Sequence, residues 1–428
     1  MTILFLIGMT LAVLMLIATF LWPQTGLAAQ LVGIMFSVII VSYMGMASGI
    51  LYATFALMMI GMLVFIFTKK ASPFRFTTQE WLVFALLAWM ILSLLYTPTP
   101  IYGQNKILRF IGICLASLVL CRIFGSTREY MESTLRVLGW MSMFVVAFYI
   151  LLFVFARGFF TLENQLSGGS HNLMLGYTAA TGVVLTFHLI MSRDSRLWTR
   201  IVAGAVVSCG MVVIVASESR GPFLGLLGGA ALTFLGRKAM SRSILTLFLL
   251  AVVTVVALWC FAPEAARNRI LAGFRAGALT ESGRTSIYLL GLKQYTQFPV
   301  RGQGVGAFAY YSSWEDTRDY PHNLVIEIAG EQGTIGLLLI GVVLLLCVKP
   351  ILRLRSNKEP LVAAAKTLQW LFWLGLANSM SSFDMAEQRG LFASIGFLAA
   401  VRRWPEPEEE DIAFYPEPEA EELALSAG

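Results

Sequence analysis

The sequence predicts an all-α, polytopic integral membrane protein, and its composition is the first reason. Of the 428 residues, 57% are hydrophobic and only 13% are charged, whereas a soluble domain is about 25% charged. The apolar residues gather in runs of about the length that a helix needs to cross a bilayer. We therefore expect membrane lipids around the protein. The composition excludes a cytosolic enzyme, a nucleic-acid partner and a disordered chain.

Thirteen apolar runs are long enough, or nearly long enough, to span a membrane as helices. They lie near residues 2–22, 28–46, 48–68, 81–96, 107–121, 137–156, 173–191, 201–217, 222–236, 243–261, 333–348, 367–379 and 390–401. Several later runs are short and also suit tilted pairs or re-entrant segments. Because residues 27–68 are almost continuously apolar, two, three or four crossings fit before Lys69. The sequence thus predicts 12 or 13 transmembrane helices.

Basic residues predict the orientation through the positive-inside rule. Alternate connections between the runs carry 18 Lys and Arg residues in one set and four in the other. The richer set is Lys69, Lys70, Arg75, Arg122, Arg128, Arg136, Arg193, Arg196, Arg200, Arg237, Lys238, Arg242, Lys349, Arg353, Arg355, Lys358, Arg402 and Arg403. The poorer set is Lys106, Arg157, Arg220 and Arg389. The richer set is predicted to be cytoplasmic, and so is the acidic tail that follows Arg403.

One connection on the outer side is far longer than the others. It has the pattern of short amphipathic helices at 265–276 and 285–298. A long loop in a compact protein is more often functional than a structural cap on the membrane. The chain is thus divided into transmembrane helices (1–261), this large loop (262–332), further transmembrane helices (333–404) and a disordered tail (405–428).

Two arginines at predicted helix starts on the outer side are candidates for binding a diphosphate. Arg220 comes shortly before Pro222, and proline suits the first turn of a helix. Arg284 follows Ser282, a residue type that caps helix N-termini. Helix N-termini attract anions, and arginine binds phosphate oxygens in pairs while staying charged. The alternative role for Arg220 is a membrane anchor or a partner of Glu218.

His322 is a candidate functional residue of the large loop, because histidine titrates near neutrality. Tyr320 and Asn323 flank it, and Pro321 restricts the backbone just before it. The segment is therefore predicted to aim the ring, although a lone loop histidine is usually a surface residue.

A glycine-rich segment and two aspartates complete the candidate chemistry of the loop. Residues 301–306 lack the Lys-Ser/Thr of a P-loop, so we interpret them as a tight turn that lets backbone approach the site. Asp316 and Asp319, with His322, offer few ligands for a hard divalent ion. We expect no metal and no other cofactor.

These motifs, in this order, resemble the O-antigen ligase family, which includes lipid A-core O-antigen ligases, O-antigen polymerases and exopolysaccharide polymerases. The resemblance is carried by residues 93–100, Ser219-Arg220-Gly221-Pro222, Gly283-Arg284, residues 301–308, and His322-Asn323 followed by Gly333 and Gly336. The spacing after His322 is the most specific element and favours the ligase branch. Members typically have 12 spans and a periplasmic site, which favours 12 crossings here.

The resemblance implies a metal-independent, inverting glycosyl transfer in lipopolysaccharide biosynthesis, on the periplasmic face of the bacterial inner membrane. The donor would be a glycan on undecaprenyl diphosphate, and the acceptor would be a hydroxyl of the lipid A-core oligosaccharide. Arg220 and Arg284 would bind the diphosphate, and His322 would be the base. We also expect Arg301, Asn323 and Tyr320 to contact the substrate.

Two alternatives stay open from the sequence. A polymerase would use the same donor, with a second lipid-linked glycan as acceptor. A transporter or flippase would place charged residues within its spans, facing a cavity at the midplane. The basic residues that come nearest to that pattern, Arg109 and Lys366, both lie near the end of a run, which favours a transferase.

Overall fold

The computed structural model describes residues 14–32, 47–69, 76–155, 170–192, 195–217, 220–234, 284–355 and 362–405. Within these ranges the regular elements are all helices, which confirms the all-α fold class. Several sequence predictions lie outside the described residues: the apolar run at 243–261, the amphipathic segment at 265–276, the tail beyond 405, and much of the apolar runs at 2–22 and 28–46. The same holds for eight of the basic residues used for the orientation, namely Lys70, Arg75, Arg157, Arg193, Arg237, Lys238, Arg242 and Lys358.

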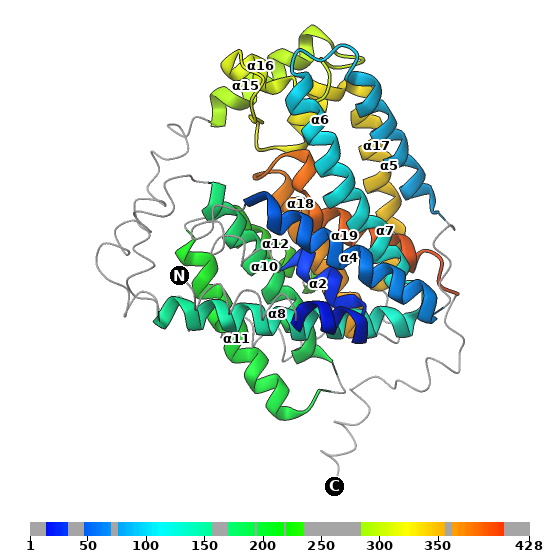
Figure 1. Cartoon of the computed structure of the whole chain (residues 1–428), viewed down its shortest axis with the longest axis vertical. Helices are drawn as coiled ribbons and strands as arrows, with labels where there is room; N and C mark the ends of the chain where they lie inside the picture. Colours follow the sequence, from blue (N-terminus) through cyan, green and yellow to red (C-terminus); the bar gives the residue numbers. More distant parts are fainter. Residues whose placement is uncertain are drawn as a thin grey trace.

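The helices pack as one bundle with a smaller helical group at one end (Figure 1). They are α2 (Gln24–Leu31), α4 (Ala47–Lys69), α5 (Thr78–Ser93), α6 (Pro100–Arg109), α7 (Ala116–Phe124), α8 (Arg128–Phe155), α10 (Ser170–Met191), α11 (Leu197–Ala216), α12 (Arg220–Phe234), α15 (Arg284–Gln297), α16 (Phe308–Ser313), α17 (Leu324–Arg355), α18 (Val362–Ser379) and α19 (Arg389–Val401). In the bundle, α12 packs on α18, α7 on α19, and α10 on both α8 and α11. The short helices α15 and α16 form the group at the top of Figure 1.

Four helices of the described part are long and apolar enough to cross a membrane. They are Pro100–Phe124, Met174–Met191, Leu197–Ile214 and Leu324–Leu354. Shorter apolar helices lie at Phe55–Thr68, Thr78–Ser93, Gly221–Phe234 and Arg389–Val401. Most of these helices follow the predicted apolar runs, as expected of a membrane protein. The total of 12 or 13 crossings stays a prediction.

The structure corrects the position of Lys106, which the sequence analysis placed in an outer connection. A π-helical segment, Phe110–Leu115, joins α6 to α7 in one continuous helix that begins at Pro100. The helix starts early because proline suits its first position and because Asp316 caps it from the large loop. The two carboxylate oxygens of Asp316 accept hydrogen bonds from the backbone N–H groups of Ile101 and Tyr102, each at 2.8 Å. Lys106 therefore lies within the helix, fully buried.

Helix α17 is kinked at Gly333, whose φ is 66°. The two residues after Gly333 donate their N–H groups to the carbonyl oxygens of Pro299 and Val300, at 2.8 and 3.3 Å. In a straight helix these N–H groups would donate to the carbonyl oxygens of Gly330 and Glu331. Those two oxygens accept instead from the N–H groups of Gln303 and Gly304, at 3.0 and 2.9 Å. The glycine-rich turn is thus docked into the kink, and every exchanged backbone group keeps a partner.

The same turn contacts the segment that joins α5 to α6. Ser93 Oγ accepts from the N–H of Val305 at 3.0 Å, and the hydroxyl of Thr97 donates to the Val305 carbonyl at 2.8 Å. A Cβ on Gly304, whose φ is 101°, would lie 2.7 Å from Thr97 Cβ, so a side chain does not fit there. The predicted tight turn is therefore present, and it joins two of the motifs that carry the family resemblance.

Arginines from three predicted cytoplasmic connections lie at one end of the bundle. Arg128 and Arg353 both donate to the carbonyl oxygen of Pro405, at 2.9 and 2.6 Å. Arg403 donates to the carbonyl oxygen of Phe76, just before α5. The positive-inside rule requires these three arginines to lie on the same side of the membrane. Their hydrogen bonds to Pro405 and Phe76 are consistent with that placement.

Candidate active site

His322 lies just before α17 in a backbone conformation that few residues adopt. Its φ is 55°, in the left-handed region, and such strained residues cluster at functional sites. Its Nδ1 atom is buried and has no hydrogen-bond partner among the described residues. Burial is the largest cause that lowers the pKa of His322 below its usual value, and the charge of the Arg284 guanidinium is the second. The carboxylate of Asp319 acts in the opposite direction and raises this pKa. The neutral form of the ring is therefore favoured more than in an ordinary histidine, and Nδ1 is a buried polar atom that the described residues leave without a partner.

Tyr320 supports the imidazole ring from one side. The ring centroids of Tyr320 and His322 are 4.5 Å apart. The guanidinium carbon of Arg318 lies 5.5 Å from the Tyr320 centroid. Burial raises the pKa of the Tyr320 hydroxyl, with an opposing effect from Arg318. Tyr320 is therefore a neutral layer between His322 and Arg318, and its predicted contact with substrate stays a prediction.

Asn323 fixes the backbone on the other side of His322. Its side-chain oxygen accepts from the N–H groups of Val325 and Ile326, both at 3.1 Å, which makes it the N-cap of α17. Its amide nitrogen donates to the carbonyl oxygen of Met380 at 2.9 Å. Asn323 was predicted to contact the substrate; in the structure its amide ties the start of α17 to the segment between α18 and α19.

Replacing Asn323 with alanine is expected to lower the free energy of unfolding by about 1–2 kcal/mol, because the cap is lost. Asn323→Asp is the matched control, since a carboxylate keeps the capping oxygen and loses only the donor to Met380. Denaturation of the purified variants in detergent micelles measures the difference. An alanine variant as stable as the wild type would show that α17 does not depend on this cap.

The structure brings Arg284 close to His322. Arg284 is the first residue of α15 and its side chain is exposed. Its charge is the largest single electrostatic influence on the pKa of His322. The start of α15, where backbone N–H groups favour anions, is therefore within electrostatic reach of the candidate base, and their joint action on one substrate stays a prediction.

Arg220 is the first residue of α12, which confirms that it stands at a helix start; its side chain lies outside the described part. The next residue, Gly221, packs closely on the segment between α18 and α19. A Cβ on Gly221 would lie 2.6 Å from Ser381 Oγ. Asn323 bonds to the neighbouring Met380, so the starts of α12 and α17 meet at the same segment.

Arg301 makes a different set of contacts. Its guanidinium carbon lies 4.7 Å from the ring centroid of Tyr96 and 5.5 Å from that of Phe298. Its carbonyl oxygen accepts a hydrogen bond from the Tyr96 hydroxyl at 3.1 Å. These contacts hold the glycine-rich turn against the start of the α5–α6 connection. A role for Arg301 in substrate binding stays a prediction.

A buried ion-pair cluster beneath His322 was missed by the sequence analysis. Lys106 on α6 pairs with Glu327 and with Glu331 of α17; the distance to Glu331 Oε2 is 2.7 Å. All three side chains are 0–1% exposed. Glu327 also accepts from the N–H of Met385, at 3.0 and 3.1 Å. The cluster therefore ties α6, the first turns of α17 and the segment before α19 to one another.

A second group of charges continues this cluster towards the surface. Arg109 lies 2.9 Å from Asp384 and 3.2 Å from Glu387. Arg318 lies 2.7 Å from Glu387, and the Tyr102 hydroxyl donates to Asp384 at 3.1 Å. The sequence analysis gave charges within the spans as a sign of a transporter. Here each of these four charged side chains pairs with a side chain of opposite charge among the described residues.

One signal in the sequence pointed to the missed glutamates. Glu327 and Glu331 are four residues apart, directly after Asn323, and this spacing places both on one face of a helix. The apolar run itself begins only at Gly333, because the polar first turns of the helix lower the local hydropathy. Their partner, Lys106, is more than 200 residues away in the chain, and sequence spacing carries no sign of such pairing.

The three residues considered as metal ligands are not arranged as a site. Asp316 uses both carboxylate oxygens to cap α6, and Asp319 accepts from the N–H of Tyr320 at 2.8 Å. In the described part of the chain, no group of three or more His, Cys, Asp and Glu residues is placed to hold a metal ion.

Comparison with known protein families gives one match. Residues 203–341, about a third of the chain, match the model of the O-antigen ligase family. The matched stretch contains Arg220, Arg284 and His322, together with the glycine-rich turn and Glu327. No curated protein matches the chain. Over residues 203–341 the chain is therefore similar to the O-antigen ligase family, the family that its motifs were predicted to resemble.

Proposed function

We propose that the protein is an O-antigen ligase, which transfers O-antigen polysaccharide from undecaprenyl diphosphate to the lipid A-core oligosaccharide. The observation that carries the proposal is His322, whose backbone is in the left-handed region and whose pKa is lowered by burial and by the charge of Arg284. Arg284 begins α15, and both residues lie within the stretch that matches the family. A base beside a fixed cation is what transfer from a diphosphate requires.

In the proposed reaction, an acceptor hydroxyl attacks the anomeric carbon of the lipid-linked sugar. The new glycosidic C–O bond forms as the bond between that carbon and the diphosphate oxygen breaks. His322 takes the proton of the hydroxyl, and the lipid diphosphate leaves with the bonding electron pair. Arg284 and Arg220 stabilise its developing negative charge. A single displacement of this kind inverts the anomeric configuration, and no residue in the scheme needs a metal.

The proposed site lies on the periplasmic face of the bacterial inner membrane. The large loop carries His322 and Arg284, and α15 and α16 occupy one end of the molecule (Figure 1). The arginines of the predicted cytoplasmic connections contact Pro405 and Phe76 instead, away from these helices. A flipped, lipid-linked donor and a lipid A-core acceptor would meet at the loop, with the C-terminal tail in the cytoplasm.

Reconstitution tests the proposal directly. Purified protein in vesicles is supplied with lipid-linked O-antigen and lipid A-core, and the product is read on a gel. Appearance of polysaccharide on lipid A-core supports the ligase. Longer lipid-linked chains without any core-linked product would identify the polymerase, and no transfer to either acceptor would contradict both.

We expect Arg284→Lys to lose most of the activity of the wild type, almost as much as Arg284→Ala. Lysine keeps the charge, but it cannot bind two phosphate oxygens in one plane as arginine does. Arg220→Lys should behave in the same way. Transfer rates and donor binding of the purified variants measure the loss. Full activity in either lysine variant would reduce that arginine to a point charge or an anchor.

A further inference from the structure

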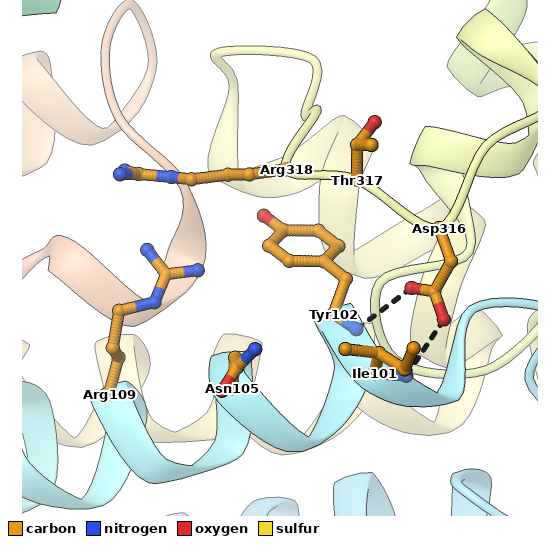
Figure 2. A pocket seen from close by; sticks show the side chains of 7 residues that line it. All are labelled: Ile101, Tyr102, Asn105, Arg109, Asp316, Thr317 and Arg318. Carbon is orange, nitrogen blue, oxygen red and sulfur yellow. Dashed lines mark hydrogen bonds between the residues drawn. The ribbon is translucent and has the colours of Figure 1, made fainter.

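A small pocket opens between α6 and the segment before Tyr320 (Figure 2). Its volume is about 190 Å³, below the range of about 300–1,000 Å³ that drug-sized ligands occupy. Such a volume suits a single sugar ring. The lining residues are Ile101, Tyr102, Asn105, Arg109, Asp316, Thr317 and Arg318.

Polar groups with free bonding capacity line this pocket. Asn105 and Thr317 are exposed, and their side chains have no hydrogen-bond partner among the described residues. Arg318 is 48% exposed, and Arg109 contributes part of its guanidinium. Figure 2 shows both guanidinium groups on the same side as the Tyr102 hydroxyl. A ligand here would meet an amide, a hydroxyl and two guanidinium groups.

The charge of the pocket favours a neutral ligand over a phosphate. Arg109 is paired with Asp384 and Glu387, and Arg318 with Glu387. Two guanidinium groups thus face two carboxylates, and an anion would gain no net attraction while it approached them. A polyol gains from both kinds of group, because each hydroxyl both donates and accepts hydrogen bonds.

The pocket is linked to the candidate base through two side chains in contact. Arg318, which lines the pocket, lies over the ring of Tyr320. The ring of Tyr320 in turn contacts that of His322 in a tilted arrangement, with the centroids 4.5 Å apart.

We propose that this pocket is the subsite for one sugar ring of the acceptor glycan. The inference rests on the proposed function, because it assumes that His322 activates an acceptor hydroxyl. The ring in the pocket would hold the acceptor chain so that a neighbouring hydroxyl reaches His322. Asn105 binds this ring directly and is a specificity residue for the acceptor, separate from the arginines at the starts of α12 and α15 that bind the donor.

The test measures transfer rate against acceptor concentration at saturating donor. Asn105→Ala should raise the KM for lipid A-core by about 3- to 10-fold, the effect of one or two lost hydrogen bonds. Asn105→Phe should raise it further, because the larger side chain fills the pocket. The turnover at saturating acceptor and the KM for the donor should not change in either variant.

Gln104 provides matched controls. It is the preceding residue on α6 and is also exposed, but it does not line the pocket. Gln104→Ala and Gln104→Phe should leave the KM for the acceptor at the wild-type value. If the Asn105 variants keep the wild-type KM while the wild type transfers glycan, the subsite is wrong and the proposed function stands.

Other results separate the remaining cases. If the Asn105 variants change the KM for the donor, or weaken inhibition by inorganic diphosphate, the pocket binds an anion and the acceptor assignment is overturned. If the wild type transfers nothing to any acceptor, it is the proposed function that fails.

Discussion

Replacing His322 with alanine is expected to lower turnover by about 100- to 10,000-fold, the usual contribution of a positioned base. Binding of the lipid-linked donor should survive, because the proposed diphosphate contacts come from Arg220 and Arg284. Transfer rate and donor binding are measured on the same purified variant. If His322→Ala transfers normally, or loses donor binding while bound donor still turns over, His322 is a structural or binding residue.

The pH profile gives an independent check on this role. A base works only when deprotonated, and burial together with Arg284 lowers the pKa of His322. The neutral form therefore persists to a lower pH than for an ordinary histidine, whose pKa is about 6.5. The rate of the wild type should be constant near pH 7 and fall only as the pH drops through the lowered pKa. In Arg284→Ala, the residual rate should fall at a higher pH, because one cause of the shift is gone.

Replacing Lys106 with methionine is expected to lower the free energy of unfolding by about 3–5 kcal/mol. Methionine fills a similar volume, but it leaves Glu327 and Glu331 facing each other without a cation in a fully buried place. Denaturation in detergent micelles measures the loss. Lys293→Met is the matched control: Lys293 is an exposed lysine on α15, so its replacement should change stability by less than about 0.5 kcal/mol.

A further variant separates the loss of charge pairing from the loss of packing. In Lys106→Met combined with Glu327→Gln and Glu331→Gln, no charge is left unpaired, so much of the lost stability should return. A single Lys106→Met variant as stable as the wild type would show that the ion pairs do not hold α6 to α17.

The sequence predicted the helices well where the signal is local. Apolar runs and helix-start residues depend on neighbours within one or two turns, so α5, α10, α11, α12 and α19 begin within a few residues of their predicted places. The grouping of Arg128, Arg353 and Arg403 at one end also followed, because the positive-inside rule depends only on where a charge lies relative to the nearest span. The pairing of residues far apart in the chain, such as Lys106 with Glu327 and Glu331, could not be predicted from the sequence.

The candidate site was predicted only in part for the same reason. His322, Arg284 and the glycine-rich turn are visible as motifs. The left-handed backbone of His322 and its contact with Arg318 through Tyr320 depend on how the large loop folds. The first turns of α6 and α17 carry Lys106, Glu327 and Glu331. Hydropathy alone excludes such polar turns from a span, although the lysine pairs with both glutamates when the helices pack.

The docking of the glycine-rich turn into the kink of α17 has a consequence for biogenesis. A segment that enters the bilayer alone must satisfy its own backbone, so α17 should first insert as a straight helix. The turn can dock only when two of those helical hydrogen bonds open and are exchanged for bonds to residues 299–304. The kink at Gly333 is therefore a product of assembly, made after the large loop has been exported. Because His322 is held at the start of this helix, the catalytic geometry would be completed late, once every span is already in the membrane.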